Sequence, residues 1–187
     1  MPTDVIDLTK ELIQQRSVSA DSNAPISDYL QEQLEAIGCQ IERLEYVDQN
    51  GETKVNLIGK LGDGTGGLAF CSHSDTVPGQ EVDWPAFEPE IKDGKLYGRG
   101  SCDMKGPLAA TIIAASKVDT NALKKPIYII VTADEEIGLF GAKYIVEHSK
   151  ILANDKPEYG IIAEPTEMVP VYAHKGGAGA EVTSYGV

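Results

Sequence analysis

The chain has 187 residues, of which 42% are hydrophobic and 24% charged, a composition typical of one globular domain with a substantial core. Acidic residues number 29 against 16 basic ones, and the net charge of -13 argues against nucleic acid or an anionic membrane as a partner, because phosphate groups would be repelled. We expect neither a secretory signal nor a membrane helix of ~18 apolar residues, and three cysteines without CxxC spacing favour free thiols in a reducing cytoplasm.

Two amphipathic helices are expected at the start of the fold. Apolar residues recur at helical spacing over residues 3–15, where Thr3 or Asp4 serves as the N-cap. The same spacing returns over residues 26–37, and Gly38 follows as a C-terminal stop. Each helix therefore presents one apolar face for packing against the rest of the domain.

A hairpin and then alternating strands and helices follow. Asn50-Gly51 is a strong hairpin signal between two segments that alternate like strands. The expected strands are 41–47, 54–60, 68–73, a central strand 127–132, a short buried strand 159–163, and a last pair, 169–173 and 180–185. The expected helices are 104–118 and 138–149. This order predicts an α/β fold, a three-layer sandwich with a mixed, mostly parallel central sheet.

Polar side chains follow three of these strands at the point where each strand ends. His73 and Asp75 follow the first of them, Asp134, Glu135 and Glu136 the second, and Glu164 the third. In open α/β sheets, ligands bind at the carboxyl ends of the strands. We therefore expect these imidazole and carboxylate groups to meet at one edge of the sheet.

The pair His73 and Asp75 suits a metal ligand and its support. The two residues stand two positions apart, so their side chains lie on one side of an extended chain. A ligating imidazole usually passes its other ring proton to a carboxylate, and Asp75 is a candidate for that role; the alternative is a solvated strand end. Asp103, which precedes a predicted helix, can bridge two cations or cap the helix.

Glu135 and Glu136 are adjacent, so their side chains diverge if the backbone is extended. One can then ligate a metal while the other accepts a proton from water that the ion has acidified to a pKa of ~7. Glu164 adds one more carboxylate. One neutral nitrogen with several oxygens suits Zn²⁺, with Mn²⁺ or Co²⁺ as alternatives. The alternative for each acid is a solvated surface charge.

Four motifs occur in order between about residues 70 and 166. They are His73-Ser74-Asp75-Thr76-Val77-Pro78, YGRGSCDMKG at 97–106, TADEE at 132–136 and Glu164-Pro165-Thr166. Together they resemble the zinc-dependent deacylases and exopeptidases, the family of acetylornithine deacetylase, succinyl-diaminopimelate desuccinylase and related carboxypeptidases. Residues 125–136 and 171–176 are most similar to its acetylornithine deacetylase branch. The resemblance implies the fold of that family's zinc-exopeptidase-like catalytic domain.

The resemblance also implies a two-zinc site. His73 and Glu164 would hold the first ion, and Asp103 would bridge the two ions. Glu136 would hold the second ion. Zn²⁺ is the ion expected in both sites, and Co²⁺ or Mn²⁺ are the alternatives.

Two further residues receive roles from the resemblance. Asp75 would orient His73, and Glu135 would act as the general base and then as the general acid toward the leaving amine. The resemblance also implies a non-proline cis peptide bond between Asp103 and Met104. The site would then combine metal ligands with a separate carboxylate for proton transfer.

The resemblance places residues 1–187 in the N-terminal portion of the catalytic domain. Family members continue into a lid and dimerisation domain, through which a homodimer is expected, and then return to complete the catalytic domain. The returning part supplies a His to the second metal, and the lid contacts the substrate. His148 is expected on a helix surface, and nothing puts His174 in place of the missing ligand. We therefore expect a second metal site that is incomplete within these residues.

The activity implied is hydrolysis of the amide bond of an N-acylated amino acid, with release of a carboxylate and a free amine. A dipeptidase or carboxypeptidase that acts on short peptides is the alternative within the family. An alternative from another class is a non-catalytic fragment that retains the motifs and a partial metal site.

Overall fold

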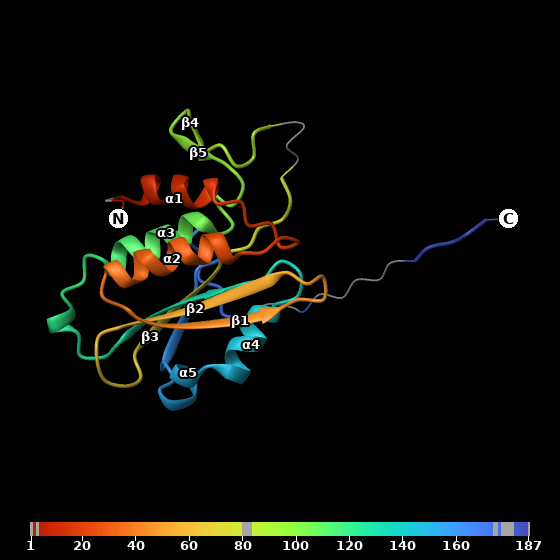
Figure 1. The fold of residues 1–187 in the computed structure, drawn as a ribbon. Helices are drawn as coiled ribbons and strands as arrows, with labels where there is room; N and C mark the ends of the chain where they lie inside the picture. Colours follow the sequence, from red (N-terminus) through yellow and green to blue (C-terminus); the bar gives the residue numbers. More distant parts are fainter. Residues whose placement is uncertain (1, 3, 80–83, 174–175, 177–181, 187) are drawn as a thin grey trace.

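The computed structural model describes residues 2, 4–79, 84–173, 176 and 182–186. Its centre is a five-stranded sheet in the order β1-β2-β6-β3-β7 (Figure 1). The strands are β1 (Gln40–Val47), β2 (Thr53–Leu61), β3 (Leu68–His73), β6 (Ile127–Thr132) and β7 (Tyr159–Ile162). β1 and β2 form the predicted hairpin, and β6 lies at the centre of the sheet as expected.

The sheet is mixed, as predicted. β2 runs antiparallel to both of its neighbours, β1 and β6, whereas β3 runs parallel to β6 and to β7. Four of the five strands therefore share one direction. Because β3, β6 and β7 are parallel, their carboxyl ends meet at one edge of the sheet. The polar residues that follow these strands are thereby gathered in one place.

Helices cover both faces of the sheet and complete the three predicted layers (Figure 1). One face carries α1 (Val5–Gln14), α2 (Ala24–Ala36) and α3 (Lys105–Ala115), and the other carries α4 (Phe140–His148) and α5 (Lys150–Asn154). A short 3-10 helix, Thr120–Ala122, follows α3. Asp4 caps α1 as predicted, since its Oδ1 accepts the N–H of Asp7 at 2.9 Å, while Thr3 lies outside the described residues. Among the described residues, no helix is long and apolar enough to cross a membrane.

Alternate residues of the central strands point to opposite faces and build two cores. Leu57 of β2 and Ile129 of β6 pack with the helices α1, α2 and α3. Their neighbours in sequence, Ile58 and Tyr128, pack on the other face with Ile145 of α4. The strands β2 and β6 are therefore covered on both sides, which holds their ends in fixed positions.

Two predicted elements differ in extent or in burial. The helix predicted over 104–118 is shorter, because the N–H groups of Lys117 and Val118 bond three residues back and tighten the chain into a turn. The prediction of 159–163 as a buried strand is wrong about burial. β7 is an edge strand paired with β3, and its Tyr159 and Ile162 are 71% and 70% exposed. Apolar composition alone does not reveal whether a strand is covered.

The last predicted pair of strands is absent from the described residues. Residues 169–173 and 182–185 form no strand there, and residues 180–181 lie outside the described part of the chain. Val171 is 61% exposed and Tyr172 is fully exposed. The β-branched and aromatic pattern predicted strands, but a strand needs a partner for its backbone hydrogen bonds.

A small hairpin occupies a region that the sequence did not predict as regular structure. β4 (Glu90–Lys92) pairs antiparallel with β5 (Lys95–Tyr97). The turn residues Asp93 and Gly94 have φ of 51° and 72°, the left-handed pair that Asp-Gly favours in hairpins. The Asp-Gly signal was present, but strands of three residues are too short to show alternation.

Asp155, which follows α5, ties two strands together at the end of the sheet away from His73. Its carboxylate accepts hydrogen bonds from Lys60 Nζ at 2.6 Å and from Tyr128 Oη, and these contacts lower its pKa to about 2. We expect Asp155→Ala to lower the free energy of unfolding by about 2 kcal/mol, because charge-assisted hydrogen bonds are lost. Urea unfolding measures the change. The control Glu158→Ala removes an exposed ion pair with Lys125 and should change it by less than about 1 kcal/mol. Equal losses would contradict this role for Asp155.

Candidate metal centre

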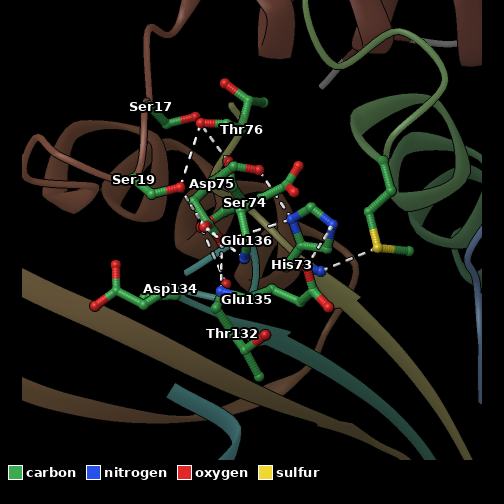
Figure 2. Close-up of polar contacts among 12 residues, drawn as sticks. Ser17, Ser19, His73, Ser74, Asp75, Thr76, Thr132, Asp134, Glu135 and Glu136 are labelled. Atoms are coloured by element: carbon green, nitrogen blue, oxygen red, sulfur yellow. Dashed lines mark hydrogen bonds and ion pairs between the residues drawn. The ribbon is translucent and has the colours of Figure 1, made fainter. Parts of the chain in front are cut away.

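His73 ends β3 and is 2% exposed. Its ring Nδ1 lies 2.8 Å from the carbonyl oxygen of Asp75 (Figure 2). A carbonyl oxygen only accepts, so we infer that Nδ1 carries a proton and donates it. In the neutral imidazole this leaves the lone pair on Nε2. Nε2 is therefore the atom available to a cation.

The Nε2 atom of His73 faces carboxylates from three parts of the chain. Asp103 Oδ1 lies at 3.0 Å, Glu164 Oε1 at 3.6 Å and Glu135 Oε2 at 3.9 Å. Two groups have potential ligand atoms within 4.8 Å of one another: His73 with Glu135 and Glu164, and His73 with Asp103 and Glu136. The carboxylates are partly exposed while the imidazole is buried. The site therefore opens to solvent on its acidic side.

Asp103 does not cap α3. Met104 occupies the N-cap position, and no side chain makes a cap hydrogen bond there. The peptide bond between Asp103 and Met104 is cis, as the family resemblance implied. The Met104 sulfur accepts the backbone N–H of His73 at 3.2 Å. The Asp103 carboxylate is thus free of the helix and lies against the imidazole.

The Asp75 carboxylate supports the backbone of both adjacent glutamates (Figure 2). Its Oδ1 accepts the N–H of Glu135 at 3.1 Å, and its Oδ2 accepts the N–H of Glu136 at 3.3 Å. Oδ2 also accepts the hydroxyl of Ser19 at 2.7 Å. Because Oδ1 lies 3.5 Å from His73 Nδ1, Asp75 holds the imidazole and the two glutamates in one frame.

Glu135 and Glu136 lie in a turn and not in an extended segment. We call residues 134–138 the acidic turn. Its first residue, Asp134, has φ of 54°, in the left-handed region that few residues other than glycine adopt. Both glutamates have an oxygen grouped with a ring nitrogen of His73. Their side chains therefore converge on the same centre, where an extended backbone would have separated them.

Burial and mutual repulsion set the proton affinities of the site. Burial disfavours the imidazolium, but hydrogen bonding to Asp75 and the charges of Asp75 and Glu164 raise the pKa of His73 to about 9. Burial and the charge of Asp103, opposed by His73, raise the pKa of Glu164 to about 6. Burial and the charge of Asp103 also raise the pKa of Glu136. Negative charge is thus in excess among these side chains.

These residues fit a divalent cation. One imidazole nitrogen and the oxygens of several carboxylates converge, which is a donor set that borderline divalent ions accept. Burial first, and then repulsion from neighbouring carboxylates such as Asp103, raise the pKa values of Glu136 and Glu164. A divalent cation would replace that repulsion by attraction.

The structure brings together the six residues that were given a role in the site, namely His73, Asp75, Asp103, Glu135, Glu136 and Glu164. The Asp134 carboxylate, which was expected to join them, instead faces Tyr46 and Lys54. His148 instead lies on the exposed side of α4, stacked on Tyr144 with ring centroids 4.1 Å apart. His174 lies outside the described residues. Ser19 and Lys54, which are buried beside the acidic turn, could not be predicted from the sequence, because neither belongs to a recognisable motif.

Gly141 lets α4 approach the strand end that precedes the acidic turn. A Cβ at this position would lie 2.3 Å from the backbone oxygen of Ala133 and 2.3 Å from Asn56 Oδ1. We expect Gly141→Ala to lower the free energy of unfolding by about 1–3 kcal/mol, because the crowded backbone must shift. Thermal unfolding measures this. Gly160→Ala is the control, since its Cβ meets nothing within 4 Å. Unfolding at the same temperature in both variants would sink the prediction.

The fold and the cluster of acids around a buried imidazole are those of a metallopeptidase family. Residues 69–185 match peptidase family M20/M25/M40, and this match covers more than half of the chain. The chain therefore belongs to this family. The matched region contains the imidazole and every carboxylate of the site, and the family implies a divalent metal there.

Particular relatives refine this assignment. The acetylornithine deacetylase of Proteus mirabilis (strain HI4320) is 42% identical over 184 residues, which cover 94% of this chain and 46% of that protein. The acetylornithine deacetylase of Myxococcus xanthus is 41% identical over 175 residues, covering 92% and 44%. An M20 family metallo-carboxypeptidase from Sulfolobus solfataricus matches the fold with a TM-score of 0.70 and 22% identity, over 87% of this chain and 37% of that chain. The chain thus spans about half the length of the curated relatives it matches.

Proposed function

We propose that the protein hydrolyses the amide bond of an N-acylated amino acid with the help of two zinc ions. The observation that carries the proposal is the convergence of the buried His73 imidazole with four carboxylates at the carboxyl edge of the sheet. Relatives that are 42% and 41% identical and are acetylornithine deacetylases support a small N-acyl amino acid as the substrate. The products would be a carboxylate and a free amine.

The proposed metal ligands are those that the family resemblance implies. We assign His73 and Glu164 to the first ion, Glu136 to the second, and Asp103 to the position between them. The grouping of His73 with Glu164, and of Asp103 with Glu136, supports this division. When bound, zinc ions polarise a carbonyl group and lower the pKa of water to ~7. Co²⁺ or Mn²⁺ would suit the same donors.

Glu135 is the residue assigned to proton transfer. Its side chain is 33% exposed on the open side of the site, so it can reach water, and its backbone N–H is fixed by Asp75. Glu135 accepts the proton of the attacking water and then returns it to the nitrogen of the leaving amine. The Asp75 carbonyl keeps the proton of His73 on Nδ1, so the lone pair of Nε2 would be the one offered to a metal ion.

The proposal extends to the parts of the enzyme that the family resemblance implies. Residues 1–187 would form the N-terminal portion of the catalytic domain in a cytoplasmic homodimer. A lid and a returning segment would supply the contacts that select the acyl group and the His ligand of the second ion. The chain covers 46% of the Proteus mirabilis relative, a length that leaves room for such further segments in an enzyme of that size.

Zinc content and a substrate panel test the proposal. Elemental analysis and hydrolysis of N-acetylornithine, N-succinyl-diaminopimelate and dipeptides are measured on the 187-residue chain and on any longer protein that contains it. We expect both to bind zinc and N-acetylornithine to be the best substrate of the longer protein. Preference for dipeptides would show the peptidase alternative, and a chain that binds no zinc would refute the metal centre.

A further inference from the structure

Lys54 is a buried lysine of β2 that the proposed function does not use. The residue is 1% exposed. Its Nζ donates to the carbonyl oxygens of Ser19 at 2.7 Å and Asp21 at 2.8 Å. Lys54 Nζ also forms ion pairs with Asp134 Oδ1 at 3.1 Å and with Asp48 Oδ2 at 3.6 Å. The contact with Asp134 Oδ1 does not have the geometry of a hydrogen bond. A buried ammonium group is expensive to desolvate unless it is held by such partners. The position of Lys54 is therefore specific.

Asp134, the partner of Lys54, begins the acidic turn and is itself 1% exposed. Its side chain points away from His73 (Figure 2). Its Oδ2 accepts the hydroxyl of Tyr46 at 2.7 Å, while Oδ1 faces Lys54. Contacts at both oxygens hold this residue in its left-handed conformation, with φ of 54°. The direction in which the chain leaves Asp134 sets where the next two glutamates point.

Lys54 also contacts the residues that support the acidic turn through Asp75. The Asp75 carboxylate accepts the N–H groups of Glu135 and Glu136, and the hydroxyl of Ser19 holds that carboxylate. The carbonyl group of the same serine accepts a hydrogen bond from Lys54. The Lys54 ammonium group therefore contacts both Asp134, which begins the acidic turn, and Ser19, whose hydroxyl holds the Asp75 carboxylate that supports the turn.

We propose that Lys54 is a positioning residue of the metal centre. It clamps the acidic turn so that Glu135 and Glu136 present their carboxylates to His73. The importance of this clamp for hydrolysis rests on the proposed function, but the clamp itself exists in the metal-free chain. Loss of the ammonium group leaves Asp134 as a buried charge without its ion-pair partner, and the turn then opens more often.

Three variants separate this role from general stability. Lys54→Met removes the charge and keeps a long flexible side chain. Tyr46→Phe removes only the hydroxyl that holds Asp134, and it tests the clamp in a chain that keeps the ion pair. Lys60→Met is the matched control, because Lys60 is on the same strand and its Nζ pairs with Asp155 at 2.6 Å, at the other end of the sheet.

Amide hydrogen exchange, measured on the chain without added metal, reports how often the acidic turn opens. We expect Lys54→Met to lower the protection of the Glu135 and Glu136 amides about tenfold relative to the β6 amides, the ratio that loss of one hydrogen bond predicts. Zinc affinity, measured by competition with a chelator, should fall about 10–100-fold, as for other supports of metal ligands. Lys60→Met should leave the protection ratio and the zinc affinity unchanged.

Tyr46→Phe should lower the protection ratio of the Glu135 and Glu136 amides by a smaller factor. If Lys54→Met does not fold, Tyr46→Phe is the variant that tests whether the contacts of Asp134 hold the acidic turn. An unchanged ratio in whichever of the two variants folds would overturn the positioning role. Zinc binding by the unmodified chain is measured separately. A lack of zinc binding would refute the proposed function. The exchange ratio tests the positioning role of Lys54 separately, because it is measured with no metal present.

Discussion

Replacing Glu135 with glutamine is expected to lower kcat by about 10²–10⁴-fold, while the zinc content of the protein stays the same. Glutamine preserves the size of the side chain but cannot accept a proton at neutral pH. The Glu135 carboxylate lies 3.9 Å from His73 Nε2 and is partly open to solvent, which suits a group that exchanges protons with water. Steady-state hydrolysis of N-acetylornithine, with elemental analysis of the same preparation, measures both quantities.

Glu136→Gln is the matched comparison, because it alters the neighbouring residue of the same turn. Its expected effect is weaker zinc binding, since Glu136 is assigned to the second ion. The geometry also groups an oxygen of Glu135 with His73 and Glu164, so a ligand role for Glu135 is a distinct alternative. A Glu135→Gln variant that loses zinc, and that recovers its activity when zinc is added, would contradict its assignment as the base.

The central strands could be predicted from sequence with their observed bounds. β3 and β6 match the predicted 68–73 and 127–132, because each begins as an apolar run directly after a glycine or a proline and ends on polar residues. Asn50-Gly51 likewise placed the hairpin of β1 and β2. These features are local, and the local pattern agrees with the fold.

The C-terminal part of the chain shows where local patterns fail. β7 and residues 169–173 have the apolar and β-branched composition of buried strands, yet Ile162 and Val171 are 70% and 61% exposed. Burial of a strand depends on what covers its faces and which strand pairs with its edge. Neither property can be predicted from the residues of the strand alone.

The candidate site was predictable from the expected direction of the strands. Parallel strands place their carboxyl ends at one edge, so residues that follow β3, β6 and β7 meet there, although 62 positions separate His73 from Glu135 and 91 separate it from Glu164. The supports of the site were not predictable. Lys54 Nζ binds the carbonyl of Ser19, 35 residues away, and no spacing or motif signals such a contact.

Zinc affinity of the chain is expected to fall steeply as the solution becomes more acidic. Binding requires a neutral imidazole and ionised carboxylates. In the metal-free chain the pKa of His73 is raised to about 9 and that of Glu164 to about 6. Zinc therefore displaces one proton between these values and two protons below the lower one. The dissociation constant should rise about tenfold per pH unit from pH 7 to 6, and about a hundredfold per unit below pH 6.

Chelator competition over this pH range measures the dissociation constant, and calorimetry in buffers of different ionisation enthalpy counts the protons released. Glu164→Gln is the comparison, because it removes the carboxylate that titrates near pH 6. Its affinity should be lower throughout, and its slope should stay near tenfold per unit below pH 6, since His73 alone then supplies the displaced proton. If the zinc affinity of the unmodified chain does not change between pH 7 and 6, zinc does not displace a proton from His73, and the prediction is contradicted.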